Sequence, residues 1–154
     1  MEQIKQGFSL IDQISQQELQ HLITVSTGFI DAYIIECYDL EPMLLPQNIV
    51  LSALDSSTAV PFVEWHDLKL PVHKLTAPEH RQGVALVIEG DEIQQRFALM
   101  CKEMPKTIRL RISEVVDVER PIDKAAVFQY VKMGEQTYHI PNLVKIQQSL
   151  GIVV

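Results

Sequence analysis

Cysteine, glycine and tryptophan are scarce in this chain, which has two cysteines, six glycines and one tryptophan among 154 residues. The glycines form neither a Gly-x-x-x-x-Gly-Lys-Ser/Thr run nor a Gly-x-Gly-x-x-Gly run, so the sequence has no recognisable cradle for nucleotide phosphates. Cys37 and Cys101 lie in separate apolar runs, unlike the close pairs of metal or redox sites. We expect two buried free thiols, although the sequence leaves open a disulfide between them.

Basic residues are also in the minority. Thirteen lysines and arginines face 20 aspartates and glutamates, which gives a formal charge of −7 and a surface that repels nucleic-acid phosphates. No window approaches about 18 uncharged apolar residues, and the N-terminus lacks the basic and apolar regions of a signal peptide. We therefore expect a cytoplasmic protein with no nucleic-acid partner and no direct membrane insertion.

The N-terminal segment carries the signals of one helix. Ser15 and Glu18 have the spacing of a capping box, and Leu19, Leu22 and Ile23 fall on one helical face. This pattern predicts a helix from Gln16 to about Val25. Residues 1–28 are thus predicted to be a helical extension that docks on the domain that follows.

From Ala32 onward the chain is rich in β-branched and aromatic residues, and turn residues separate its apolar runs. Two hairpins are predicted, Val84–Cys101 around Gly90-Asp91 and Ala126–Ile140 around Gly134-Glu135. A short amphipathic helix, Pro141–Leu150, is predicted to follow and to stop at Gly151. Apolar residues make up 47% of the chain, enough for a packed core.

This order of elements resembles the CheW-like family of chemotaxis adaptors over roughly Ala32 to Leu150. The family carries a motif of the form Asn-Leu-Arg-Gly-x-x-x-Pro-Val, and the similar stretch here is Glu64–Val72, which ends in Pro71-Val72. His66-Asp67 stands where the family has Arg-Gly. The resemblance implies a mainly β fold in which residues 29–154 form two small five-stranded β-barrels with a short C-terminal helix.

The same resemblance implies a function. It describes a non-catalytic adaptor that couples a methyl-accepting chemoreceptor tip to a CheA-type histidine kinase, in chemotaxis or in type IV pilus (twitching) signalling. No cofactor or metal is expected, and formation of a homodimer is left open. The candidate partner-binding residues are Ile49, Leu51 and Met104 in a groove between the barrels, and Glu64, Trp65, His66 and Asp67 at the motif. Loss of the family's Arg-Gly pair leaves open whether both partner contacts are kept.

Two further questions stay open at the level of sequence. The rival function is a small β-barrel enzyme or ligand sensor that uses Cys101 and a histidine, and a thiol within hydrogen-bond reach of an imidazole would favour it. His66, His73 and His80 recur every seven residues, but Pro71 and Pro78 interrupt the helix that would align them as metal ligands. Trp65 is expected either to cap the core or to anchor a partner.

Overall fold

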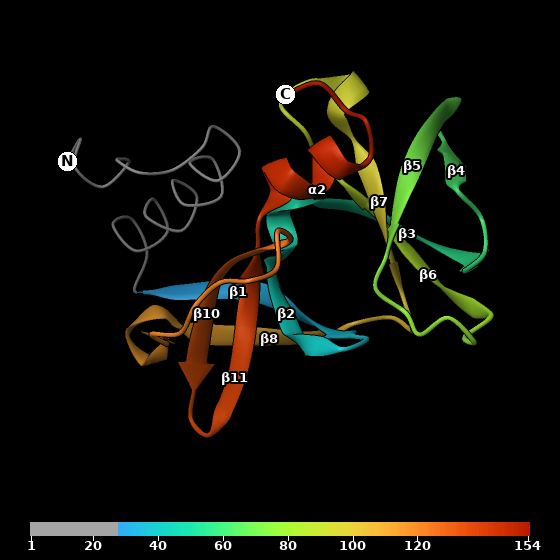
Figure 1. Ribbon diagram of the computed structural model, residues 1–154. Coiled ribbons are helices and arrows are strands. Elements are labelled where there is room, and N and C mark those ends of the chain that lie inside the picture. Colours follow the sequence, from blue (N-terminus) through green and yellow to red (C-terminus); the bar gives the residue numbers. More distant parts are fainter. Residues whose placement is uncertain (1–27) are drawn as a thin grey trace.

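The computed structural model describes residues 28–154 as a mainly β structure with two sheets lying side by side (Figure 1). The predicted helix Gln16–Val25 lies outside the described residues. Within them, no helix has the length and apolar character needed to cross a membrane. The elements are β1 (Phe29–Cys37), β2 (Leu40–Pro46), η2 (Gln47–Ile49), β3 (Val50–Ser57), β4 (Phe62–Trp65), β5 (Leu68–Lys74), β6 (Gln82–Ile88), η3 (Ile93–Gln95), β7 (Phe97–Cys101), β8 (Lys106–Arg111), η4 (Ile112–Glu114), β9 (Val116–Asp117), β10 (Val127–Met133), β11 (Gln136–Pro141) and α2 (Leu143–Ser149).

The first sheet has the strand order β8-β1-β2-β11-β10-β9. Its two edge strands, β8 and β9, follow each other in the chain with only η4 between them, so the two edges lie close together and the sheet curls. A β-bulge between Ile35 and Cys37 adds to the local twist of β1. The sixth strand, β9, has only two residues, so the sheet is close to the five strands that the resemblance implied.

The second sheet has the order β3-β6-β7-β5-β4, which gives the five strands expected. Its edge strands, β3 and β4, are again consecutive in the chain, and the same argument makes this sheet curl. The predicted hairpin Val84–Cys101 is confirmed as the antiparallel pair β6–β7. Pro71 lies where β5 stops pairing with β4 and begins to pair with β7, so its missing N–H is tolerated inside the sheet.

Three apolar clusters hold this arrangement together. The first-sheet core is built around Ile30, Leu44 and Leu110, and the second-sheet core around Leu70, Val87 and Met100. The third cluster, which we call the junction core, takes side chains from both sheets and from α2. Its buried members are Ile35, Met43, Leu45, Leu75, Leu86, Ile88, Phe97, Leu99, Cys101, Leu143, Val144 and Ile146.

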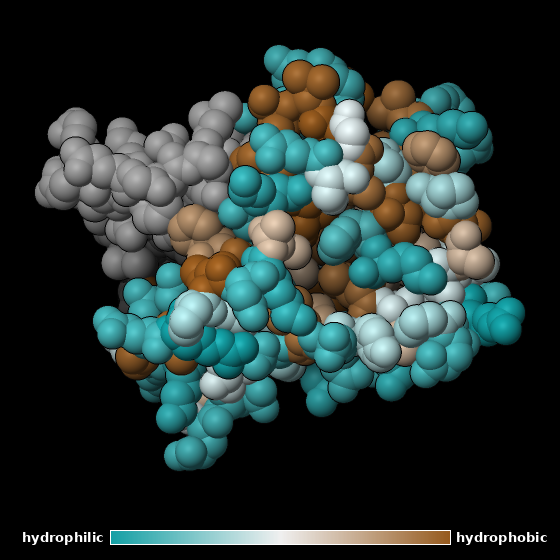
Figure 2. Space-filling view, in the orientation of Figure 1, coloured by the Kyte–Doolittle hydropathy of each residue, from teal (hydrophilic) through white to brown (hydrophobic). Residues whose placement is uncertain are grey.

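The closing helix is confirmed, but its predicted start at Pro141 is wrong. Pro141 is the last residue of β11 and pairs with Val127 of β10. Asn142 is the N-cap, and its side-chain oxygen accepts a hydrogen bond from the Lys145 backbone N–H. Figure 2 shows apolar surface gathered over α2 and between the two sheets, whereas the tip of the β10–β11 hairpin is hydrophilic.

Candidate partner-binding site

The motif segment Glu64–Val72 forms the β4–β5 hairpin at the edge of the second sheet. Trp65 pairs with Leu68, so His66 and Asp67 are the two residues of the turn. Both have a positive φ, 50° and 64° respectively, as a type I′ turn requires. Because both turn residues and Glu64 are exposed, the hairpin presents an imidazole and two carboxylates to solvent.

Trp65 is half-buried at the base of this turn. One part of its ring packs against the second-sheet core. The ring also stacks on His66, with centroids 4.0 Å apart and planes 19° apart, and the Arg96 guanidinium lies 5.5 Å from its centroid. Trp65 therefore contributes to the core while keeping a polar and partly accessible border, and its role as a partner anchor stays a prediction.

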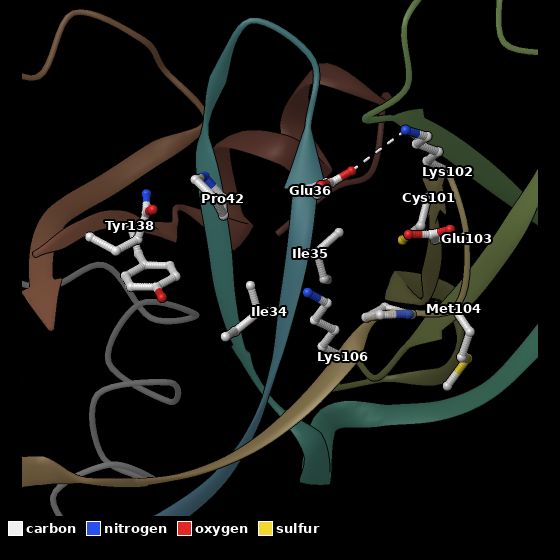
Figure 3. A pocket seen from close by; sticks show the side chains of 12 residues that line it. Ile34, Ile35, Glu36, Pro42, Cys101, Lys102, Glu103, Met104, Lys106 and Tyr138 are labelled. Atoms are coloured by element: carbon white, nitrogen blue, oxygen red, sulfur yellow. Dashed lines mark ion pairs between the residues drawn. The ribbon is translucent and has the colours of Figure 1, made fainter. Parts of the chain in front are cut away.

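A groove of about 240 Å³ lies between the two sheets. Figure 3 shows the ribbons of β1 and β2 running between Tyr138 on one side and Met104 on the other. Lys102 and Glu36 form an ion pair across the groove at 3.8 Å, and Met104 is 50% exposed. The lining residues are Ile34, Ile35, Glu36, Pro42, Cys101, Lys102, Glu103, Met104, Pro105, Lys106, Gln136 and Tyr138.

Of the three residues expected in the groove, only Met104 lines it. Ile49, in η2, is half-buried against the junction core, and its carbonyl accepts a hydrogen bond from the Glu89 N–H at 2.9 Å. Leu51 lies at the start of β3 and packs against the second-sheet core. The seven predicted residues thus separate into the hairpin group, Met104 in the groove, and two side chains committed to packing.

Comparison with known proteins supplies the deciding observation for the fold. No protein-family model matches the sequence, and no curated protein matches it significantly. The structure is similar to the crystal structure of the scaffolding protein TtCheW from Thermoanaerobacter tengcongensis, with a TM-score of 0.56 over 74% of this chain and 84% of that chain. The fold is CheW-like. Sequence identity across the match is 13%, so the likeness lies in the arrangement of elements.

Within the CheW-like fold, the groove contains residues that sequence reasoning missed. Ile34, Ile35 and Pro42 come from β1 and β2, whereas Tyr138 comes from β11, nearly a hundred residues further along the chain. These strands become neighbours only through the pairing of β11 with β2, in which His139 lies opposite Met43. Met104 was the one lining residue expected, and that expectation came from the family resemblance.

The two thiols are poorly suited to nucleophilic chemistry. Burial raises the pKa of both Cys37 and Cys101 to about 12, so both are protonated near neutral pH. Each Sγ faces a main-chain oxygen of its own strand, that of Ile35 at 3.5 Å and that of Leu99 at 3.7 Å. Residues 28–154 contain no cluster of three or more His, Cys, Asp or Glu side chains arranged to hold a metal.

Proposed function

We propose that this protein is a non-catalytic adaptor that couples a methyl-accepting chemoreceptor tip to a CheA-type histidine kinase. The observation that carries the proposal is the open groove between two barrels in a CheW-like fold, beside a separate exposed hairpin. Two such surfaces allow one small domain to hold two partners. The similar structure is itself described as a scaffolding protein, which supports a role through association.

The groove is the proposed receptor site. Its walls carry apolar side chains, including Ile34, Pro42 and Met104, and its rim carries the charges of Glu36 and Lys102. An amphipathic helix binds such a surface by placing its apolar stripe in the groove and its polar flanks on the rim. A helix of the receptor tip is the occupant that this chemistry fits.

The β4–β5 hairpin is the proposed kinase site. His66 stacks on the half-buried Trp65 ring, and Glu64 and Asp67 are exposed on the same hairpin, so an aromatic anchor lies among polar groups. The arginine that the family carries is replaced by His66, so this contact relies on the ring of Trp65 more than on a fixed positive charge. We place the complex in the cytoplasm, in chemotaxis or type IV pilus signalling.

The first experiment tests the hairpin. We expect Trp65→Ala to weaken association with the kinase by at least about 2 kcal/mol, the usual threshold of a hot spot. Tyr38→Ala is the matched control and should keep native affinity, because Tyr38 is an aromatic residue, 59% exposed, that follows β1 and lies outside the hairpin. Titration calorimetry measures affinity, and thermal unfolding reports whether the variant is folded. Native affinity in a folded Trp65→Ala variant would move the kinase site elsewhere.

The second experiment tests the groove with a pair of charge insertions. Met104→Asp places a carboxylate on the groove wall, and Ile93→Asp places one on an equally exposed apolar residue of η3, outside the groove (56% exposed against 50% for Met104). We expect only Met104→Asp to weaken binding of a purified receptor-tip fragment, by about tenfold or more, because it buries an unpaired charge under the helix. Equal losses in the two variants would contradict a receptor site in the groove.

A further inference from the structure

A second hollow, of about 280 Å³, lies at the junction of the two sheets. It is formed by the end of β1 and the turn after it, by the end of β5, and by the segment between β9 and β10. We call it the basic hollow. None of its lining residues lines the groove or lies at the turn of the β4–β5 hairpin; they are Cys37, Tyr38, Asp39, Leu40, His73, Lys74, Leu75, Thr76 and Lys124.

The charge of the basic hollow is opposite in sign to that of the chain. Lys74 and Lys124 bring two ammonium groups and Asp39 one carboxylate, so the lining has a formal charge of +1 in a protein of −7. The Lys124 Nζ donates to the main-chain oxygen of Asp39 at 3.1 Å, which holds the side chain against the β1–β2 turn. Since an ammonium has three N–H donors, Lys124 can serve this bond and a ligand together.

Thr76 also borders the hollow, but its Oγ1 is buried away from the open space, so this side chain shapes the wall and offers no donor to a ligand. His73 lines the same hollow, and its imidazole can donate from one ring nitrogen when neutral.

We propose that the basic hollow binds a small molecule through a phosphate group. Two ammonium groups match the double negative charge of a phosphate, and the His73 imidazole supplies a neutral donor to one of its remaining oxygens. The hollow is several times the roughly 30 Å³ that one water occupies, which leaves room for a phosphate with a small substituent. This ligand site goes beyond the adaptor function and does not depend on it.

The test is a titration of the full-length protein with inorganic phosphate at constant ionic strength and near-neutral pH. The backbone amide resonances of Asp39 and Thr76 report occupancy. We expect saturable shifts in the unaltered protein and at least about tenfold weaker binding in Lys74→Glu/Lys124→Glu, because two attractions become repulsions. Lys132→Glu/Lys145→Glu is the matched control, since it changes the net charge equally at two exposed lysines outside the hollow.

His73→Phe separates a built site from general attraction, because it removes the ring N–H donor while keeping a flat ring at the same place. We expect roughly fivefold weaker phosphate binding in this variant. If charge reversal prevents folding, Lys74→Gln/Lys124→Gln replaces it and should also weaken binding. O-phosphoserine in a parallel titration distinguishes the sources: tighter binding than inorganic phosphate identifies a phosphate monoester, and equal binding identifies the free ion. Equal affinity in hollow and control variants, or the same shifts with acetate, would overturn the proposal.

Discussion

At the scale of single residues, His66 and Asp67 are notable because side chains other than glycine occupy left-handed backbone positions in a turn of two residues. A Cβ atom in this region crowds the following carbonyl, at a cost of about 1–2 kcal/mol for most residues and less for aspartate and asparagine. The family motif has glycine where this chain has Asp67. Glycine at that position of the motif avoids this steric cost, whereas Asp67 adopts the left-handed conformation with strain.

Relief of this strain can be measured. Asp67→Gly should raise the free energy of unfolding by about 0.5–1 kcal/mol, because glycine adopts the left-handed conformation without a steric penalty. Urea unfolding measures the change. Asp91→Gly serves as control, since Asp91 is exposed and does not have a positive φ. It should be neutral or destabilising, and a similar gain in both variants would refute the turn as the cause.

His139 is a second residue whose environment has a measurable effect. It is fully buried in β11; its Nδ1 lies 2.8 Å from the Glu41 main-chain oxygen, and its Nε2 is buried with no partner. Burial lowers the pKa of His139 below the ordinary 6.5, although the nearby Glu41 opposes this effect. The folded state therefore holds the imidazole neutral where the unfolded chain protonates it.

Stability should consequently fall on acidification. The contribution of neutral His139 to the free energy of unfolding is fully present above pH 6.5, the ordinary pKa. It decreases as the pH drops toward the lower pKa of folded His139, because the unfolded state then binds more protons. His139→Asn should reduce this slope by up to about 1.4 kcal/mol per pH unit. Part of the pH dependence should remain in this variant, because burial also lowers the pKa of His73. Urea unfolding at several pH values, with His80→Asn as control, tests the assignment; an unchanged slope in His139→Asn would contradict it.

At the scale of elements, the structure shows which contacts a sequence can predict. Both predicted hairpins are present, because each joins neighbouring strands through turn residues, such as Gly134 at a φ of 58°. The parallel pairs β5–β7 and β11–β2 were not predicted, since they join strands far apart in the chain. The groove depends on one of these pairs. The sequence, through its family resemblance, therefore indicated the motif segment and Met104, but not the part of the groove wall that β1, β2 and β11 form.

The misplaced start of α2 shows two local signals in competition. Proline at the first helical position and asparagine at the N-cap are both common, but Pro141 is held by its pairing with Val127. Asn142 is therefore the N-cap residue of α2. Asn142→Ala should lower the free energy of unfolding by about 1 kcal/mol, whereas Asn142→Asp should preserve the cap and most of the stability. Chemical denaturation compares them, and equal stability of the two variants would show that the cap contributes little.

At the scale of the whole molecule, the junction core joins the two sheets, and we expect them to unfold as one cooperative unit. It contains Leu45 from the first sheet and Leu99 from the second, both fully buried. Leu45→Ala should destabilise the protein by about 2–5 kcal/mol, as truncation in a packed core does. Because the core is shared, the loss should reach both sheets.

The fluorescence of Trp65 makes this effect visible, since the only tryptophan lies in the second sheet and the substitution in the first. Its unfolding midpoint in Leu45→Ala should shift together with that of the far-ultraviolet circular dichroism signal. Val116→Ala, at an exposed residue of β9, is the control and should shift neither. A dichroism midpoint that moves while the Trp65 midpoint stays would show that the barrels unfold separately.

The place of β11 between β2 and β10 also constrains how the protein is made. Met43 and His139 face each other across this pair, so β2 exposes an unpaired edge until the last strand has been synthesised. At translation rates of roughly 5–20 residues per second, that wait is about 5–20 seconds. During this interval the nascent chain presents the apolar run Met43-Leu44-Leu45 on an open edge, which is a template for aggregation. Ribosome-associated chaperones are therefore expected to bind this chain early, at β2, and to release it only once β11 has emerged.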